Sequence, residues 1–108
     1  MKKLLTGICA SSGKAEGVAR VVANDSNLEA FQEGEILVTK ITDPTMTIVM
    51  NRASAIVCDI GGIGSHPAII ARELGIPCVV ATRNATQIIK TGDKILVNAS
   101  EGVVYGMD

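Results

Sequence analysis

A glycine-rich turn between two apolar segments constrains this chain more than any other feature. It lies within SAIVCDIGGIGSHPAIIARELGIPCVVA, residues 54–81. The run over 54–58 has the apolar, β-branched character of a buried strand. Gly61, Gly62 and Gly64 leave the backbone free to turn sharply and permit positive φ. The sequence therefore predicts a strand that ends at the glycines and continues directly into a new element.

That new element is predicted to be a helix over residues 66–74. Ser65 is a good N-cap, with its hydroxyl accepting a hydrogen bond from a first-turn N–H, and proline is tolerated at Pro67 in that turn. Gly75 can end the helix in a left-handed conformation, and Pro77 prevents its continuation. The helix has an apolar stripe of Ile69, Ile70 and Leu74, with Arg72 and Glu73 outside it.

The rest of the chain alternates short strands with short helices. Predicted strands cover 4–10, 17–23, 35–40, 78–81, 94–98 and 103–105. A second helix is predicted over 45–52, with Asp43 or Thr42 as its cap and Pro44 in its first turn, and a helical turn over 84–89. A chain of 108 residues buries about two thirds of its unfolded surface around one core. We expect residues 1–108 to form a single compact α/β or β/β/α domain with two to three helices.

Composition excludes several classes of function. Ten basic residues balance eleven acidic ones, and aromatic residues make up 2% of the chain. A nucleic-acid partner is therefore not expected, because such surfaces combine basic grooves with stacking aromatics. The apolar run after Met1 breaks at Thr6-Gly7, and no stretch is long enough to span a bilayer. We expect a cytoplasmic protein without a membrane partner.

Three cysteines, Cys9, Cys58 and Cys78, form no CxxC pair. Each lies in or beside an apolar run, so we expect three small, buried, reduced side chains rather than a disulfide or a zinc site. A catalytic pair of Cys58 and His66 is compatible with the spacing, but no third residue to orient the base is evident.

His66 is the one histidine of the chain, and the predicted helix places it at the first helical position. The N-terminus of a helix stabilises a nearby anion, such as a phosphoryl group carried on the ring. A metal site is disfavoured because there is no second histidine. A general base would need a nucleophile beside it, and none is visible. The residues alone leave two hypotheses open, a nucleophilic histidine and an exposed histidine at a helix start.

The segment GGIGSHPAIIARELGIPCVVAT closely resembles the signature of the swivelling phosphohistidine domain, the mobile domain, of phosphoenolpyruvate (PEP)-utilising enzymes. That family includes phosphoenolpyruvate synthase, pyruvate phosphate dikinase, enzyme I of the sugar phosphotransferase system and rifampicin phosphotransferase. The matching positions are Gly61, Gly62, Ser65, His66, Ala68, Ile69, Ala71, Arg72, Gly75 and Pro77. TGICASSGKAEGVARVV, GEILVTKITDP, RASAIVCDIGG and TGDKILVNASEGVVY are similar to other family segments, so the resemblance covers essentially the whole chain.

The resemblance implies that His66 is the catalytic nucleophile and takes a phosphoryl group on Nε2. Ser65 would cap the helix and help to hold the phosphate, and Gly61, Gly62 and Gly64 would shape the loop. Arg72 could contact phosphate or a docked partner, and a structural ion pair is an equally good interpretation.

Two departures from the family pattern affect the expected regulation and the helix start. Gly64 stands where the synthase and dikinase branch usually has a threonine that is a regulatory site in parts of that branch, so such regulation is not expected here. Pro67 replaces a residue that is usually alanine, which stiffens the helix start.

The resemblance also implies partners. In relatives this domain lies between a nucleotide-binding domain of ATP-grasp type and a PEP- or pyruvate-binding domain, and this chain has no phosphate-binding loop pattern of its own. We expect a phosphotransferase component, a separate subunit or a fragment, that is not a complete enzyme alone. It would bind no metal or cofactor itself, and Mg²⁺ would belong to the partners. The alternatives are a non-catalytic anion-binding or protein-interaction module and, less favoured, a cysteine-dependent hydrolase.

Overall fold

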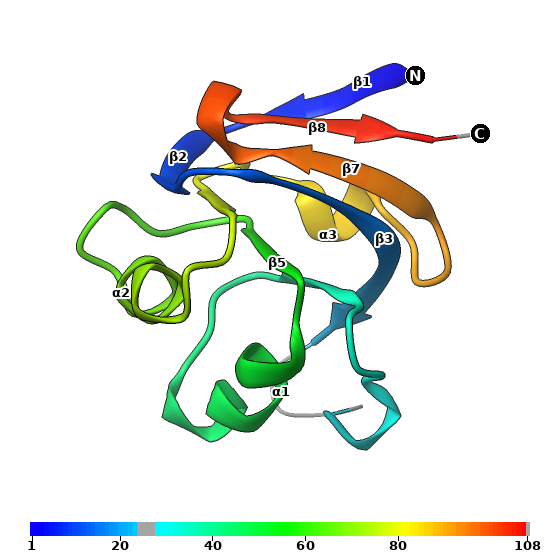
Figure 1. The fold of residues 1–108 in the computed structure, drawn as a ribbon. Coiled ribbons are helices and arrows are strands. Elements are labelled where there is room, and N and C mark those ends of the chain that lie inside the picture. Colours follow the sequence, from blue (N-terminus) through cyan, green and yellow to red (C-terminus); the bar gives the residue numbers. More distant parts are fainter. Residues whose placement is uncertain (24–27, 108) are drawn as a thin grey trace.

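Eight strands and three short α-helices make up the computed structural model, which describes residues 1–23 and 28–107 (Figure 1). The strands are β1 (Lys2–Thr6), β2 (Ile8–Ser11), β3 (Lys14–Val22), β4 (Ile36–Thr39), β5 (Ala55–Cys58), β6 (Cys78–Val80), β7 (Lys94–Asn98) and β8 (Val103–Gly106). The α-helices are α1 (Thr47–Arg52), α2 (His66–Leu74) and α3 (Ala85–Ile88). The 3₁₀ helices are η1 (Leu28–Ala30), η2 (Pro44–Met46) and η3 (Ala99–Glu101).

The strands form one sheet in the order β1-β8-β7-β3-β4-β5-β6-β2. Its centre, β3 to β6, is parallel, and the flanking pairs are antiparallel. The register places Thr39 beside Cys58, so β4 and β5 end together at one edge of the sheet. The residues that follow these two strands therefore meet in space although a helix separates them in the sequence.

The predicted strand over 4–10 is wrong as a single element. Gly7 divides it into β1 and β2, which lie at opposite ends of the sheet. The Gly7 N–H donates to the carbonyl of Gly102 (2.8 Å), and a Cβ on Gly7 would lie 2.4 Å from the carbonyl oxygen of Val80. The chain can cross between the two edges at this point because residue 7 has no side chain.

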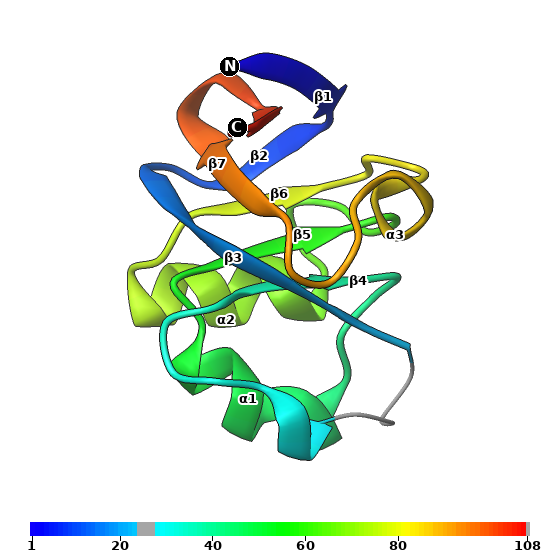
Figure 2. The same ribbon diagram turned by 90° about the vertical axis from the view of Figure 1, so that its right-hand side faces the viewer.

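Helices cover both faces of the parallel strands (Figure 2). On one face α1 and α2 pack against Leu37, Ile56 and Cys58, and on the other α3 packs against Val38 and Val57. Since neighbouring residues of a strand point to opposite faces, β4 and β5 contribute to both cores, and each strand is buried along its whole length.

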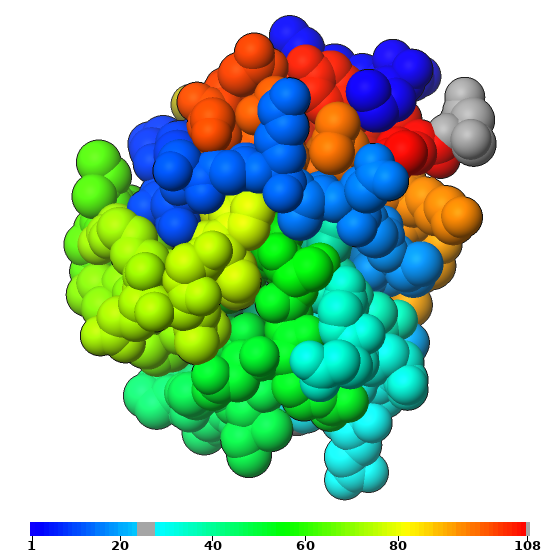
Figure 3. All heavy atoms as spheres, viewed as in Figure 1, coloured from blue at the N-terminus to red at the C-terminus, as the bar shows by residue number. Residues whose placement is uncertain are grey.

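The predicted α/β class is confirmed, and α2 has the predicted bounds. α1 begins two residues later than predicted because Pro44 to Met46 form a 3₁₀ turn. In the space-filling view the yellow-green atoms of α2 lie directly beneath the blue atoms of β2, against which this helix packs (Figure 3). Across the described residues, no helix has the length and apolar character needed to cross a membrane.

Candidate active site

His66 is the first residue of α2, as predicted, and its side chain is half-buried. Its Nδ1 lies 2.8 Å from Oγ1 of Thr42, within hydrogen-bond distance. This contact leaves Nε2, on the other side of the imidazole, without a hydrogen-bond partner among the described residues. One ring nitrogen is thus held by the protein and the other is available for chemistry.

Thr42 is the residue of this site that the sequence did not identify. It follows β4, is 4% exposed, and its backbone N–H donates to the thiol sulfur of Cys58 at the end of β5. The sequence favoured Asp43 or Thr42 as a helix cap, and Asp43 is the cap, accepting a bond from the Thr45 N–H (2.8 Å). The sequence could have indicated Thr42 in one way. If the predicted strands over 35–40 and 54–58 are parallel neighbours, the residues that follow them lie close together.

Asp43 places a negative charge close to the site. Its pKa lies below the ordinary value because the hydroxyl and the backbone N–H of Thr45 both donate to the carboxylate, and a smaller contribution comes from the charge of His66. The carboxylate therefore stays ionised at neutral pH, and its hydrogen bonds to Thr45 hold the 3₁₀ turn that follows Thr42.

Ser65 occupies the N-cap position of α2, but the hydrogen bond predicted for it is wrong. Its hydroxyl donates to the carbonyl of Gly62 (2.6 Å), and that carbonyl also accepts from the Ser65 N–H (3.1 Å). Consequently no described side chain caps the first turn of α2. The first-turn N–H groups beside His66 are left open to an anion, because the cap that would occupy one of them is turned back into the loop.

The three glycines before Ser65 have different roles. Gly61 has a φ of +123°, and a Cβ there would lie 3.0 Å from the Ser65 hydroxyl. Gly62 and Gly64 lack positive φ, and a Cβ at either would meet no atom within 4 Å. The turn therefore requires glycine at position 61, whereas positions 62 and 64 keep the approach to the ring open.

Arg72 lies in the last turn of α2 and makes two hydrogen bonds to backbone carbonyls. Its guanidinium donates to Ala10 of β2 (2.9 Å) and to Ile63 of the glycine-rich loop (2.8 Å). No ion pair to a described residue involves it, so the structural ion pair considered for Arg72 is absent from this part of the chain. The side chain connects the loop before His66 to the edge of the sheet.

The cysteines form no catalytic pair with His66. Cys58 is fully buried, and burial raises its pKa well above the ordinary value. Burial likewise raises the pKa of Cys78 to about 12. All three thiols are free, but Cys9 is only half-buried, which corrects the prediction of three buried cysteines. The described residues contain no group of three or more His, Cys, Asp or Glu side chains that could hold a metal ion.

The sequence matches one family model and several phosphoenolpyruvate synthases. The sequence model of the family described as "PEP-utilising enzyme, mobile domain" matches residues 31–102. A probable phosphoenolpyruvate synthase of Staphylothermus marinus is 53% identical over 106 residues, 96% of this chain. The phosphoenolpyruvate synthase of Aquifex aeolicus is 54% identical over 99 residues, 92% of this chain. This chain spans 13% and 12% of the lengths of these two relatives.

Solved structures show the same fold. An NMR structure of an Enzyme I protein has a TM-score of 0.63 and 34% identity, covering 74% of this chain and 33% of its own. The crystal structure of Thermococcus kodakaraensis aconitase X has a TM-score of 0.72, covering 96% of this chain and 98% of its own. At 22% identity the latter likeness concerns the fold alone.

Proposed function

Because this chain belongs to the mobile-domain family of PEP-utilising enzymes, we propose that it is a phosphoryl carrier and that His66 is its transient phosphoacceptor. The observation that carries the proposal is the hydrogen bond between His66 Nδ1 and Thr42 Oγ1 at the start of α2. In the tautomer whose Nδ1–H donates a hydrogen bond to Thr42 Oγ1, the lone pair of the neutral ring lies on Nε2. The contact therefore directs the nucleophilic nitrogen away from the protein.

The transfer step follows from this arrangement. The Nε2 lone pair attacks phosphorus, an N–P bond forms, and the P–O bond to the leaving group breaks, with the leaving oxygen keeping the electron pair. The open N–H groups at the start of α2 stabilise the new phosphoryl oxygens. Arg72 supports the loop through its carbonyl contacts. In the second half-reaction an acceptor oxygen attacks phosphorus and Nε2 recovers its lone pair.

The partners in this proposal are domains or subunits with the remaining chemistry. A nucleotide-binding site of ATP-grasp type and a PEP- or pyruvate-binding site would each meet His66 in turn, and Mg²⁺ and nucleotide would be bound there. The short span of this chain relative to the phosphoenolpyruvate synthases supports this division, since most of each relative's length lies outside the matched segment. The chain would thus be one component of a phosphotransferase.

The test is the intact mass of the purified chain after incubation with source-cell extract, Mg²⁺ and either ATP or PEP. We expect the mass to increase by one phosphoryl group that is acid-labile and alkali-stable, whereas His66→Ala gains none and keeps the wild-type circular dichroism spectrum. The effective donor identifies which half-reaction the partner performs. No gain with either donor, in an extract that phosphorylates a known relative, would contradict the proposal and favour a non-catalytic binding module.

A further inference from the structure

A second feature of the molecule lies beside the His66 loop, at the ends of β5 and β6. These strands are parallel neighbours, but the chain leaves β5 towards α2 on one face and leaves β6 towards α3 on the other. Adjacent strands with connections to opposite faces leave a crevice outside their carboxyl ends, where α/β proteins commonly bind their ligands. An open hollow of about 840 Å³ lies there and includes the start of the His66 loop, residues 59–61.

Three partly exposed isoleucine side chains line the walls of this hollow. Ile8, Ile60 and Ile88 all line it and are 47%, 44% and 40% exposed. They come from β2, from the loop after β5 and from α3, so the fold and not a local sequence run brings them together. Apolar side chains that converge on a concave surface favour an apolar occupant.

The hollow also has one free charge. Arg83 lines it and is exposed, and its guanidinium makes no hydrogen bond or ion pair with a described residue. The acidic residue of the lining, Asp59, is buried, and its carboxylate accepts bonds from the Thr86 N–H (2.9 Å) and hydroxyl (2.5 Å). The charge left to be matched is positive, so the complementary occupant has a carboxylate beside its apolar group.

Arg83 is held in place rather than presented on a loose loop. Its N–H donates to the carbonyl of Asp59 (2.8 Å), and the Thr82 N–H and hydroxyl both donate to the carbonyl of Cys58 (3.2 and 2.9 Å). Ala81 and Arg83 have φ values of +57° and +79°, which residues with side chains rarely adopt. The end of β5 thus holds both the loop that presents Arg83 and, through residues 59–61, the loop that leads to His66.

We propose that this hollow is a docking site for the domain that exchanges phosphate with His66, and that the domain inserts an apolar side chain flanked by a carboxylate. The inference rests on the proposed function. A body seated in the hollow contacts Asp59, Ile60 and Gly61, and therefore lies against the loop that ends at His66. An open hollow suits a protruding side chain of another domain better than a small molecule, which usually requires enclosure.

The test places this chain in a complete enzyme. The chain replaces the matched segment of the Aquifex aeolicus phosphoenolpyruvate synthase, and amide hydrogen exchange of residues 59–61 and 81–84 is compared with that of the isolated chain. We expect exchange to slow by about tenfold in the full-length protein, and Arg83→Glu to remove this protection. Lys90→Glu, which makes the same charge change on an exposed residue outside the hollow, should leave the protection intact.

A second pair of variants tests the apolar walls. Ile88→Gln alters the hollow, whereas Leu74→Gln alters a similarly exposed side chain at the opposite end of α2 from His66. We expect the first to weaken the protection and the second to preserve it.

Phosphate on His66, measured in the same protein with Mg²⁺ and ATP or PEP, separates the two proposals. Protection without phosphorylation would leave the docking site standing and contradict the proposed function. Phosphorylation with unprotected amides, at equal rates in wild type and Arg83→Glu, would overturn the docking site alone. Protection of the isolated chain by pyruvate or inorganic phosphate would identify a small-anion site and also overturn it.

Discussion

At the scale of single residues, the contact between Thr42 and His66 determines what the site can do. Thr42 is buried and its backbone N–H is hydrogen-bonded to the Cys58 thiol. Its hydroxyl is therefore a fixed partner for His66 Nδ1. A histidine held through one nitrogen presents the other in a defined direction, which reduces the conformational freedom lost on reaching the transition state. Thr42 is a positioning residue in this scheme, because it acts through His66.

Replacing Thr42 by valine tests this role. Thr42→Val keeps the shape of the side chain but removes the hydroxyl, so we expect the initial rate of His66 phosphorylation to fall about tenfold, the factor for one hydrogen bond. Thr42→Ser should restore most of the rate. The ¹⁵N chemical shifts of the imidazole should show a defined tautomer in the wild type and a mixture in Thr42→Val. A valine variant with the wild-type rate and tautomer would contradict the positioning role.

The buried thiols lead to a prediction on reactivity. Because burial raises the pKa of Cys58 well above the ordinary value and that of Cys78 to about 12, both stay protonated at pH 8. Iodoacetamide should therefore leave them unmodified in the folded protein and modify them after unfolding in urea, while half-buried Cys9 reacts first. Peptide mass spectrometry gives the extent of alkylation at each cysteine. Rapid native modification of Cys58 would instead support the cysteine-dependent hydrolase.

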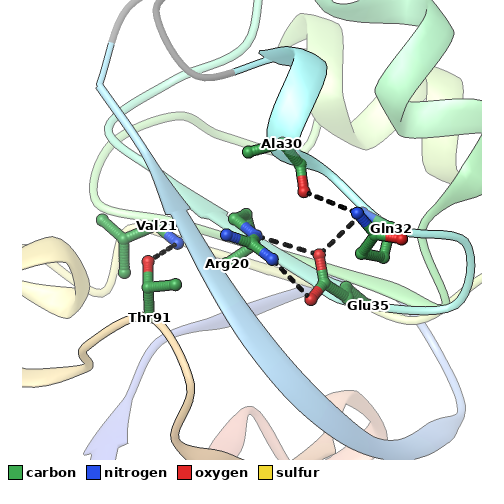
Figure 4. Close-up of polar contacts among 6 residues, drawn as sticks. All are labelled: Arg20, Val21, Ala30, Gln32, Glu35 and Thr91. Carbon is green, nitrogen blue, oxygen red and sulfur yellow. Dashed lines mark hydrogen bonds and ion pairs between the residues drawn. The ribbon is translucent and has the colours of Figure 1, made fainter.

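At the scale of secondary-structure elements, an ion pair joins β3 to Glu35, the residue before β4 (Figure 4). It lies at the opposite end of β4 from Thr39, after which the chain reaches Thr42 of the His66 site. Arg20 Nε and Nη2 donate to the two carboxylate oxygens of Glu35 (both 3.0 Å), and the Gln32 N–H donates to the same carboxylate (2.8 Å). Burial by itself raises the pKa of Glu35, but these hydrogen bonds and the charge of Arg20 hold it below its ordinary value. The pair is bidentate and mostly buried, the geometry in which such contacts stabilise a fold.

The lowered pKa of Glu35 determines how the stability of the protein changes with pH. A carboxyl whose pKa is lowered by folding stabilises the protein above its unfolded pKa, about 4.3, and loses this contribution as pH falls through the folded value. Glu35→Gln should lower the free energy of unfolding by about 1–3 kcal/mol at pH 7, and the difference from wild type should shrink towards zero below about pH 4. Urea denaturation of both proteins between pH 7 and pH 3 measures this difference in the free energy of unfolding.

Glu33 provides the matched control for that series. Its carboxylate pairs with Arg52 at 3.3 Å, but it is 77% exposed. Glu33→Gln should therefore change the free energy of unfolding by only about 0–1 kcal/mol. A Glu35→Gln difference that stayed constant down to pH 3 would show that the effect comes from packing and not from the ionised pair.

At the scale of the whole molecule, the two cores share the parallel strands and should unfold together. Ile56 packs into the core beneath α1 and α2, while the next residue, Val57, packs into the opposite core. Ile56→Ala should lower the free energy of unfolding by about 2–5 kcal/mol and shift the whole transition. Amide exchange should report the same loss in β7 as in α2. Destabilisation confined to α1 and α2 would show that the two faces unfold separately.

The sequence by itself determined the local architecture around His66. The signals that start and end α2 lie within a few residues of one another: Gly61, Pro67, Gly75 and Pro77. Glycine and proline restrict where a helix can begin and end through their local backbone preferences, so the bounds of α2 and the place of His66 in it could be predicted. The role of His66 as phosphoacceptor remains a prediction, carried by the family motif and the geometry.

Only the tertiary structure decided which residues surround His66. The bond to Thr42 spans 24 residues and exists because β4 and β5 pair in parallel, a register that no local pattern specifies. The separation of β1 from β2 at Gly7 has the same origin, since the apolar strand pattern continues through the glycine, and the two halves differ only in their partners, β8 and β6. Local conformation followed from side-chain type, whereas partner choice followed from strand order and register, which depend on the whole chain.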